Sequence, residues 1–219
     1  MQTRQLSVTE RLRELIMAGE FEPGFHLQEV PLAKSLDVSR TPVRAALIAL
    51  AQEGLLTYRP QRGYLVRKAS LEEILDAYTV RGSLESTACR LLAERGAAAE
   101  AMKILKDCLE EGDRILAAGR LTDEGFQPWR EMNNRLHQTI LTATGNDLLI
   151  DLTARTLNIP LTSSRVVHWI DYTAMRRSHD HHWVIVEAIE RRQPSRAEAM
   201  MTEHILVSSD VIRRNFGRP

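Results

Sequence analysis

The chain has 219 residues and a formal net charge of zero, with 43% hydrophobic and 26% charged residues. This composition is typical of a globular protein of one or two domains and excludes a disordered or fibrous chain. No apolar run reaches the roughly 18 residues that a membrane helix needs, and the polar start does not resemble a signal peptide. Two cysteines allow at most one disulfide, so we expect a cytoplasmic protein with reduced thiols and no membrane partner.

The first part of the chain predicts two short helices. Apolar side chains over residues 6–16 recur with the period of an amphipathic helix, and Gly19 ends that helix. A second helix is expected from about residue 28 to 36, with Pro31 in its first turn, where a proline is tolerated. These two helices precede the most informative segment of the sequence.

A third helix follows a tight turn and carries basic side chains at its start. Ser39 is a suitable N-cap, and the helix is expected to continue to Gly54. Arg40, Thr41 and Arg44 then fall within about its first turn. A helix-turn-helix protein presents such an N-terminus to the DNA major groove, so this segment predicts DNA binding.

A short hairpin is predicted directly after this helix. Residues 55–59 and 64–67 are two β-like runs, joined by the turn residues 60–63. A hairpin in this place is a wing. Arg62 and Gly63 lie at its tip, where a basic side chain and a close backbone approach suit a DNA groove or phosphate.

This order of motifs resembles the winged helix-turn-helix of the GntR family of bacterial transcription regulators. The matching residues are Leu32-Ala33, Val38-Ser39-Arg40-Thr41-Pro42-Val43-Arg44, Ala46-Leu47, Leu50, Glu53-Gly54-Leu55, Arg62-Gly63 and Val66. The resemblance implies that Arg40 and Arg44 contact bases and phosphates in the major groove. It also implies that Thr41 contacts a phosphate and that the Arg62-Gly63 tip enters the minor groove.

The chain departs from this family at one position of the second helix. Family members commonly carry a basic residue just after the glutamate that corresponds to Glu29, whereas this chain has Val30. We therefore expect one DNA contact to be missing and the operator preference to differ.

The rest of the chain is predicted to be helical. The expected helices span 71–94, 97–118, 127–144, 148–167 with a bend at Pro160, 172–192 and 194–215. Six such helices form a bundle with a central cavity. The sequence thus predicts a mainly α protein, with a DNA-binding domain over residues 1–69 and a helical domain over residues 70–219. Basic side chains outnumber acidic ones by ten to seven in the first domain, a mild excess.

Histidines in the helical region suggest a metal site. Asn133 and His137 are four residues apart and share a helix face. His182 and His204 lie at similar distances from the tight connection at 193–195, so two antiparallel helices would place them at one level. Three imidazoles brought together this way would suit Zn, Ni or a similar divalent ion. The alternative is that each histidine is a hydrogen-bonded core or surface residue.

Two further histidines, His179 and His181, have no such partner in the sequence pattern. We expect both of them to lie on the surface.

The helical region resembles the all-helical FCD effector domain of the FadR branch of the family, over about residues 71–215. The matching residues are Arg81, Leu84-Glu85, Leu136-His137, Gly145-Asn146, Leu148-Leu149, His182, Glu187-Ala188-Ile189 and Glu203-His204. Six expected helices resemble the VanR-type subgroup more than the seven-helix FadR type. In metal-binding members an aspartate and three histidines are the ligands. Here the corresponding residues are Asn133, His137, His182 and His204, and the uncharged amide implies weaker binding.

The resemblance also implies a small carboxylate effector beside the metal. Arg81 is the best candidate to bind it, because a guanidinium matches a carboxylate with two parallel hydrogen bonds. The alternative for Arg81 is an ion pair with Glu85, four residues on. Arg155 and Arg165 are weaker candidates of the same kind.

These features favour a homodimeric, ligand-responsive transcription regulator that binds a palindromic operator and is not an enzyme. One alternative is a metal-dependent hydrolase built on the histidines, although no HExxH-type motif is present and no acid has the spacing of a general base. Another is a metal-free dimerisation module, which would leave the wing and the arginines of the third helix without a purpose.

Overall fold

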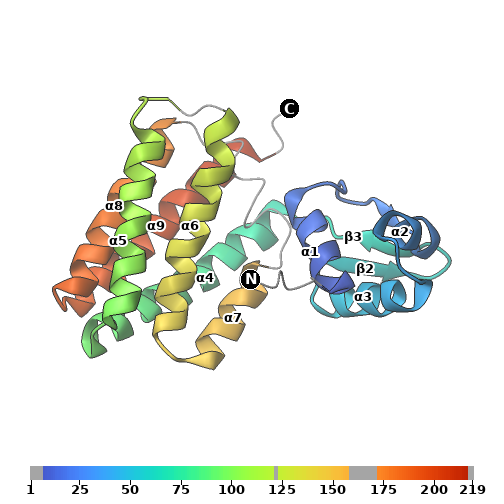
Figure 1. The fold of residues 1–219 in the computed structure, drawn as a ribbon, viewed down its shortest axis with the longest axis horizontal. Helices are drawn as coiled ribbons and strands as arrows, with labels where there is room; N and C mark the ends of the chain where they lie inside the picture. Colours follow the sequence, from blue (N-terminus) through green and yellow to red (C-terminus); the bar gives the residue numbers. More distant parts are fainter. Residues whose placement is uncertain (1–6, 121–122, 158–171, 217–219) are drawn as a thin grey trace. The chain divides into compact units, whose positions relative to one another are not determined.

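The computed structural model describes residues 7–120, 123–157 and 172–216 (Figure 1). The expected bend at Pro160 and the candidate Arg165 lie outside these residues. The chain divides into two compact units, with a boundary between Ser70 and Leu71. Among the described helices, none is long and apolar enough to cross a membrane.

The first unit is a winged helix-turn-helix. Three helices, α1 (Val8–Ala18), α2 (Glu29–Leu36) and α3 (Arg40–Gln52), enclose a core of leucine, isoleucine, valine and alanine side chains. An antiparallel sheet of order β1-β3-β2 completes the unit. Its strands are β1 (His26–Leu27), β2 (Leu56–Arg59) and β3 (Gly63–Val66). The expected helices and hairpin are confirmed to within a few residues, whereas β1 was not anticipated.

Local signals in the sequence determine where these helices begin and end. Ser7 caps α1 through a reciprocal capping box with Glu10, and Gly19 ends the helix in the left-handed region at φ 83°. Ser39 takes the extended N-cap conformation before α3, although its hydroxyl makes no capping hydrogen bond. Asp37, at φ 55°, makes the sharp turn between α2 and α3. This turn brings the start of α3 beside the start of α2.

The second unit is all-helical over its described residues. Its helices are α4 (Leu71–Arg95), α5 (Ala99–Leu116), α6 (Asp123–Ala143), α7 (Asp147–Leu157), α8 (Tyr172–Glu190) and α9 (Pro194–Asn215). Helix α4 packs along α9, and α5 lies between α6 and α8 (Figure 1). Helix α6 starts four residues before the expected position and contains Pro128 in its first turns. Both cysteines, Cys89 and Cys108, are buried and free, as expected.

Candidate functional site

Helix α3 has one buried face and carries exposed basic side chains at its start. Val43, Leu47 and Leu50 point into the core of the first unit. Arg40 and Arg44 lie outside this buried face, with 60% and 58% of their side chains exposed. Thr41 is exposed in the same turn. The residues predicted to contact DNA in the major groove therefore lie together at the exposed start of α3.

Glu29, the first residue of α2, binds both of these arginines. Arg44 donates from Nε to Oε1 at 2.7 Å and from Nη2 to Oε2 at 2.9 Å. Arg40 donates from Nη2 to the same Oε2 at 3.0 Å. Hydrogen bonds from Arg44, and then from Arg40, lower the pKa of the Glu29 carboxyl to about 2. This pairing joins α2 to α3, and sequence reasoning did not find it.

The wing ends in a tight turn that requires its glycine. Arg62 is exposed at the tip and donates its backbone N–H to the Arg59 carbonyl at 3.0 Å. Gly63 has φ 72°, and a Cβ there would lie 3.1 Å from Nε2 of His26. The predicted tip residues are therefore adjacent, and Gly63 also lets β1 approach the hairpin closely.

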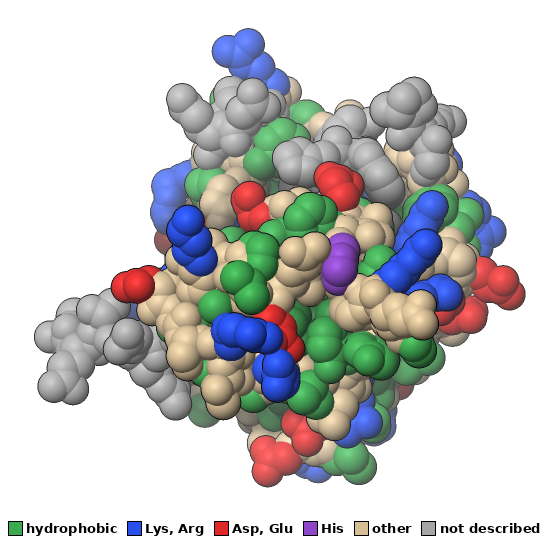
Figure 2. Space-filling view, turned by 90° about the vertical axis from the view of Figure 1, so that its right-hand side faces the viewer, with side chains coloured by type: hydrophobic (Ala, Val, Ile, Leu, Met, Phe, Trp, Pro, Cys, Tyr) green, Lys and Arg blue, Asp and Glu red, His purple; other side chains and the backbone are tan. Residues whose placement is uncertain are grey.

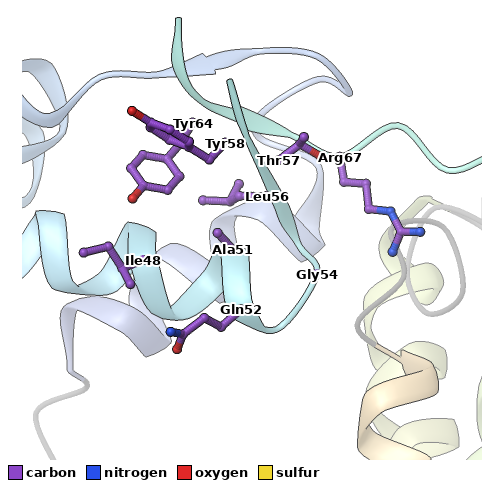
Figure 3. A pocket seen from close by; sticks show the side chains of 9 residues that line it. All are labelled: Ile48, Ala51, Gln52, Gly54, Leu56, Thr57, Tyr58, Tyr64 and Arg67. Carbon is purple, nitrogen blue, oxygen red and sulfur yellow. The ribbon is translucent and has the colours of Figure 1, made fainter. Parts of the chain in front are cut away.

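An open hollow lies between α3 and the hairpin (Figure 3). Ile48 and Ala51 line it from the helix, and Leu56 lines it from β2. The rings of Tyr58 and Tyr64 lie beside one another above it, with centroids 5.2 Å apart. Apolar side chains of α3 and aromatic rings of the hairpin therefore make up most of the lining of this hollow, together with the charged side chain of Arg67.

In the second unit, three buried histidines converge from three helices. His137 on α6, His182 on α8 and His204 on α9 have ligand atoms that all lie within 4.8 Å of one another. The Nε2 atoms of His137 and His204 are 3.3 Å apart, and the rings of His182 and His204 have centroids 4.6 Å apart. The predicted juxtaposition of these histidines is thus formed. Asn133 lies one helical turn before His137 and is half-buried.

The protonation states of His182 and His204 are compatible with binding of a metal ion. Burial, followed by the neighbouring histidines, lowers the pKa of His182 and of His204 well below its usual range. Both rings are therefore neutral at pH 7, which leaves a lone pair for a ligand. Both ring nitrogens of His182 and Nδ1 of His204 have no hydrogen-bond partner among the described residues. Buried polar atoms are rarely left unpaired, and a bound cation would satisfy them.

A buried carboxylate orients the third histidine. Glu85 on α4 accepts a hydrogen bond from Nδ1 of His137 at 2.5 Å and another from Nε of Arg81 at 2.5 Å. Burial alone would raise the pKa of Glu85, but the charge of Arg81 and the hydrogen bonds from His137 and Arg81 outweigh burial and lower the pKa. With a proton fixed on Nδ1, Nε2 of His137 presents its lone pair toward the other histidines. The Arg81–Glu85 ion pair, which was the alternative to carboxylate binding by Arg81, is present, whereas the link to His137 was missed.

The expectation of an exposed His179 is wrong, because this side chain is fully buried. It packs against Gly112 of α5 and against Trp129, whose ring centroid is 5.7 Å away. Its Nε2 lies 3.3 Å from Asp113 Oδ1. His179 is three residues before His182, so both project from one face of α8.

His181, the other histidine expected on the surface, is half-buried rather than exposed. Arg155, a weaker candidate for carboxylate binding, is exposed on α7.

Fold and site together define a DNA-binding regulator of the winged helix-turn-helix type that carries a helical second domain. Family comparisons match both units, one as bacterial regulatory proteins of the gntR family over residues 4–66 and the other as the FCD domain over residues 76–206. The chain belongs to the GntR family of transcription regulators, with a C-terminal FCD domain.

Curated transcription regulators align with this chain over most of its length. The chain is 31% identical over 200 residues to the Nta operon transcriptional regulator of Aminobacter aminovorans, covering 90% of this chain and 89% of that protein. It is 25% identical over 210 residues to the transcriptional repressor GlaR of Escherichia coli, covering 93% of each. The solved structure of E. coli McbR/YncC has the same fold, with a TM-score of 0.80 at 18% identity over 98% of this chain and all of that one.

Proposed function

We propose that this regulator binds a palindromic DNA operator as a homodimer, and that a divalent metal ion and a small carboxylate effector in the FCD domain modulate this binding. The observation that carries the proposal is the buried cluster of His137, His182 and His204. A two-fold dimer would present two copies of α3 to successive half-sites. Because its target is bacterial chromosomal DNA, we place the protein in the cytoplasm.

The DNA-contacting groups are Arg40, Thr41 and Arg44 at the start of α3, with Arg62 and Gly63 at the tip of the wing. Their support is that the side chains of Arg40, Thr41, Arg44 and Arg62 are all exposed, as contacts with DNA require. Val30 is 59% exposed and carries no charge, so α2 would add no basic contact at this position.

The metal ligands in this proposal are His137, His182 and His204, with the amide oxygen of Asn133 as a weaker fourth. The three imidazoles fit a borderline ion such as Zn²⁺ or Ni²⁺, because they are buried and their unpaired nitrogens lie close together. When bound, the ion would supply a positive centre able to accept a carboxylate oxygen.

Arg81 is the proposed partner of the effector carboxylate. It lies on α4 beside Glu85, and 12% of its side chain is exposed. Its Nε is occupied by Glu85, while the guanidinium has further N–H donors for a ligand. An anionic effector would therefore share the guanidinium with Glu85 and reach the histidine cluster through the same network. Binding of the effector would shift the hydrogen bonds among Arg81, Glu85 and His137, and so change the fraction of the protein that is able to bind DNA.

The proposal includes no catalysis. Both family matches and the curated relatives are transcription regulators. Glu85, the buried acid at the cluster, is engaged by Arg81 and His137 and is thus poorly placed to act as a general base. No observation favours the hydrolase or the metal-free module over the regulator.

The test combines metal analysis with DNA binding. The purified protein, analysed by inductively coupled plasma mass spectrometry, should contain about one Zn or Ni per chain, and His182→Ala should lose it. A thermal-shift screen of small carboxylic acids should then identify compounds that raise the melting temperature and change the anisotropy of a labelled duplex from the protein's own promoter. If DNA binding shows neither salt dependence nor sequence selectivity, the regulator proposal is wrong.

A further inference from the structure

Glu29 lies between the two arginines at the exposed start of α3. The carboxylate of Glu29 accepts three hydrogen bonds, two from Arg44 and one from Arg40. Only 22% of its side chain is exposed, although both arginines are more than half exposed. Glu29 therefore lies behind the two guanidinium groups and leaves their outer sides open to a ligand.

An acid in this position is unfavourable for attraction to phosphate. It cancels one of the two positive charges at the start of α3, in a unit whose basic excess is only ten to seven over residues 1–69. Figure 2 shows Lys and Arg side chains in separate groups on one face of the molecule, with acidic side chains among them. The basic side chains on this face are therefore scattered and do not form one continuous patch.

The hydrogen bonds leave a defined set of donors on Arg44. A guanidinium has five N–H groups, and Glu29 takes the Nε–H and one Nη2–H of Arg44. The donors that remain are both hydrogens of Nη1 and one of Nη2. One hydrogen of each nitrogen points away from the side chain, at the outer end of the group. Two parallel donors of this kind match the O6 and N7 acceptors of guanine in the major groove. An arginine held along its inner edge is therefore oriented to read a base end-on.

We propose that Glu29 is a specificity-determining residue that orients Arg44, and with it Arg40, for end-on reading of base edges while weakening contacts made to phosphate alone. This inference rests on the proposed DNA-contacting roles of Arg40 and Arg44. Glu29 itself touches no base and acts through the two arginines, so it is a positioning residue.

A purely structural role is the competing explanation. Glu29 connects α2 to α3, but the buried side chains of Leu32, Leu36, Val43 and Leu47 already hold these helices together. The first unit contains a second arginine–glutamate link with the same pattern. Arg13 on α1 donates to Glu53 through Nε at 3.0 Å and Nη2 at 2.7 Å, and this pair does not involve the start of α3. Glu53 is therefore a matched control.

The experiment uses the full chain and a random-sequence DNA duplex library. Selection with the wild-type protein yields an enriched duplex, and a scrambled version of the same composition serves as the non-specific probe. Fluorescence anisotropy at fixed salt then gives the two Kd values. The discrimination ratio is the Kd for the scrambled duplex divided by the Kd for the enriched duplex. Variants are Glu29→Gln, Glu29→Asp and the control Glu53→Gln, each checked for a wild-type circular dichroism spectrum and for a cooperative melting transition well above the assay temperature.

We expect Glu29→Gln to lower the ratio about tenfold, the loss expected when one bidentate base contact is degraded. The same variant should bind the scrambled duplex severalfold more tightly, because a negative charge is gone. Glu29→Asp keeps the charge but shortens the side chain, so it should lose discrimination without gaining non-specific affinity. Glu53→Gln should keep the wild-type ratio.

Several outcomes would overturn the inference. One is a wild-type ratio in both Glu29 variants. A second is an equal loss in Glu53→Gln. A third is tighter binding of Glu29→Gln to both duplexes with an unchanged ratio, which would make Glu29 a simple competitor of DNA.

Arg44→Ala separates this inference from the proposed function. If Arg44→Ala lowers the ratio and Glu29→Gln does not, only the role of Glu29 fails. If Arg44→Ala and Arg40→Ala also keep the ratio, or no sequence is enriched, the assigned DNA contacts fail with it.

Discussion

The ring of His137 has a carboxylate on one side and a second imidazole on the other. Its Nδ1 donates to Glu85, and its Nε2 lies 3.3 Å from Nε2 of His204. A carboxylate behind a ligating histidine fixes the tautomer and raises the basicity of the ligating nitrogen. Glu85 thereby makes the histidine cluster depend on α4, the helix that also carries Arg81.

This arrangement predicts that Glu85→Gln weakens metal binding about 10- to 100-fold, because the amide cannot fix the same tautomer. Competition titration of the apo protein with a zinc chelator measures the change. Glu94→Gln is the control, since Glu94 lies on the same helix in an exposed pair with Arg90. An unchanged zinc affinity in a folded Glu85→Gln protein would show that Glu85 does not support the ligand.

A second residue-scale prediction concerns pH. Glu29 has a pKa of about 2 in the folded chain against an ordinary value of 4.5, so its ionised form stabilises the fold. That contribution is complete above about pH 4.5 and is lost as the pH falls toward about 2. The difference in melting temperature between wild type and Glu29→Gln should therefore be constant at neutral pH and shrink only below about 4.5. Calorimetry across this range tests it, and a difference that already shrinks between pH 7 and pH 6 would contradict the low pKa.

At the scale of elements, the contact between α5 and α8 depends on the absence of a side chain. A Cβ at Gly112 would lie 2.2 Å from Cε1 and 2.6 Å from Nδ1 of His179, which is fully buried. Alanine normally favours a helix over glycine by about 1 kcal/mol. Here the steric conflict should outweigh that gain, because His179 has no room to move away from α5.

We therefore expect Gly112→Ala to destabilise the helical domain by about 1–3 kcal/mol, the cost typical of overpacking. Urea denaturation followed by circular dichroism gives the free energy of unfolding. Gly82→Ala is the matched control, since Gly82 also lies inside a helix but its added Cβ would meet Ile205 at an ordinary 3.4 Å. Equal stability in the two variants would mean that His179 readjusts without cost.

The elements were largely predictable because their signals are local. Helical periodicity, the glycine stops and the turn after α2 all lie within a few residues of the boundary they set. Strand β1 was missed because two residues show no alternation, and it exists only through pairing with Tyr64 and Leu65 of β3. His179 was misjudged because the sequence pattern offered it no partner, while its burial depends on Gly112, far away along the chain.

The histidine cluster was predictable in part for a similar reason. The levels of His182 and His204 follow from a short connection between two helices, which a single sequence displays. The link from Glu85 to His137 spans 52 residues, and the links from Glu29 to Arg40 and Arg44 span 11 and 15. Charge partners at such separations follow from tertiary packing, which periodicity does not encode.

At the scale of the whole molecule, binding of a metal ion should raise the free energy of unfolding of the chain. A ligand that binds only the folded state stabilises it by about 2.7 kcal/mol at a concentration of 100 times its Kd. Zinc or nickel should therefore raise the melting temperature of the full chain, and a chelator should reverse the rise. Differential scanning fluorimetry measures both.

His182→Ala should remove this metal-dependent rise, because it deletes one of the three clustered ligands. His181→Ala is the control: it deletes an imidazole from the same helix, but His181 is not part of the cluster. A rise of wild-type size in His182→Ala would place the metal elsewhere in the chain.

The single carboxylate shared by Arg40 and Arg44 also bears on how this regulator could evolve. Removing either arginine leaves Glu29 beside the other with one partner fewer, so the two substitutions should be strongly epistatic. A descendant with a new operator would reach it more easily by changing the acid first and the arginines afterwards. A substitution at position 29 would thus make later changes of Arg40 and Arg44, and with them a change of target sequence, easier to tolerate.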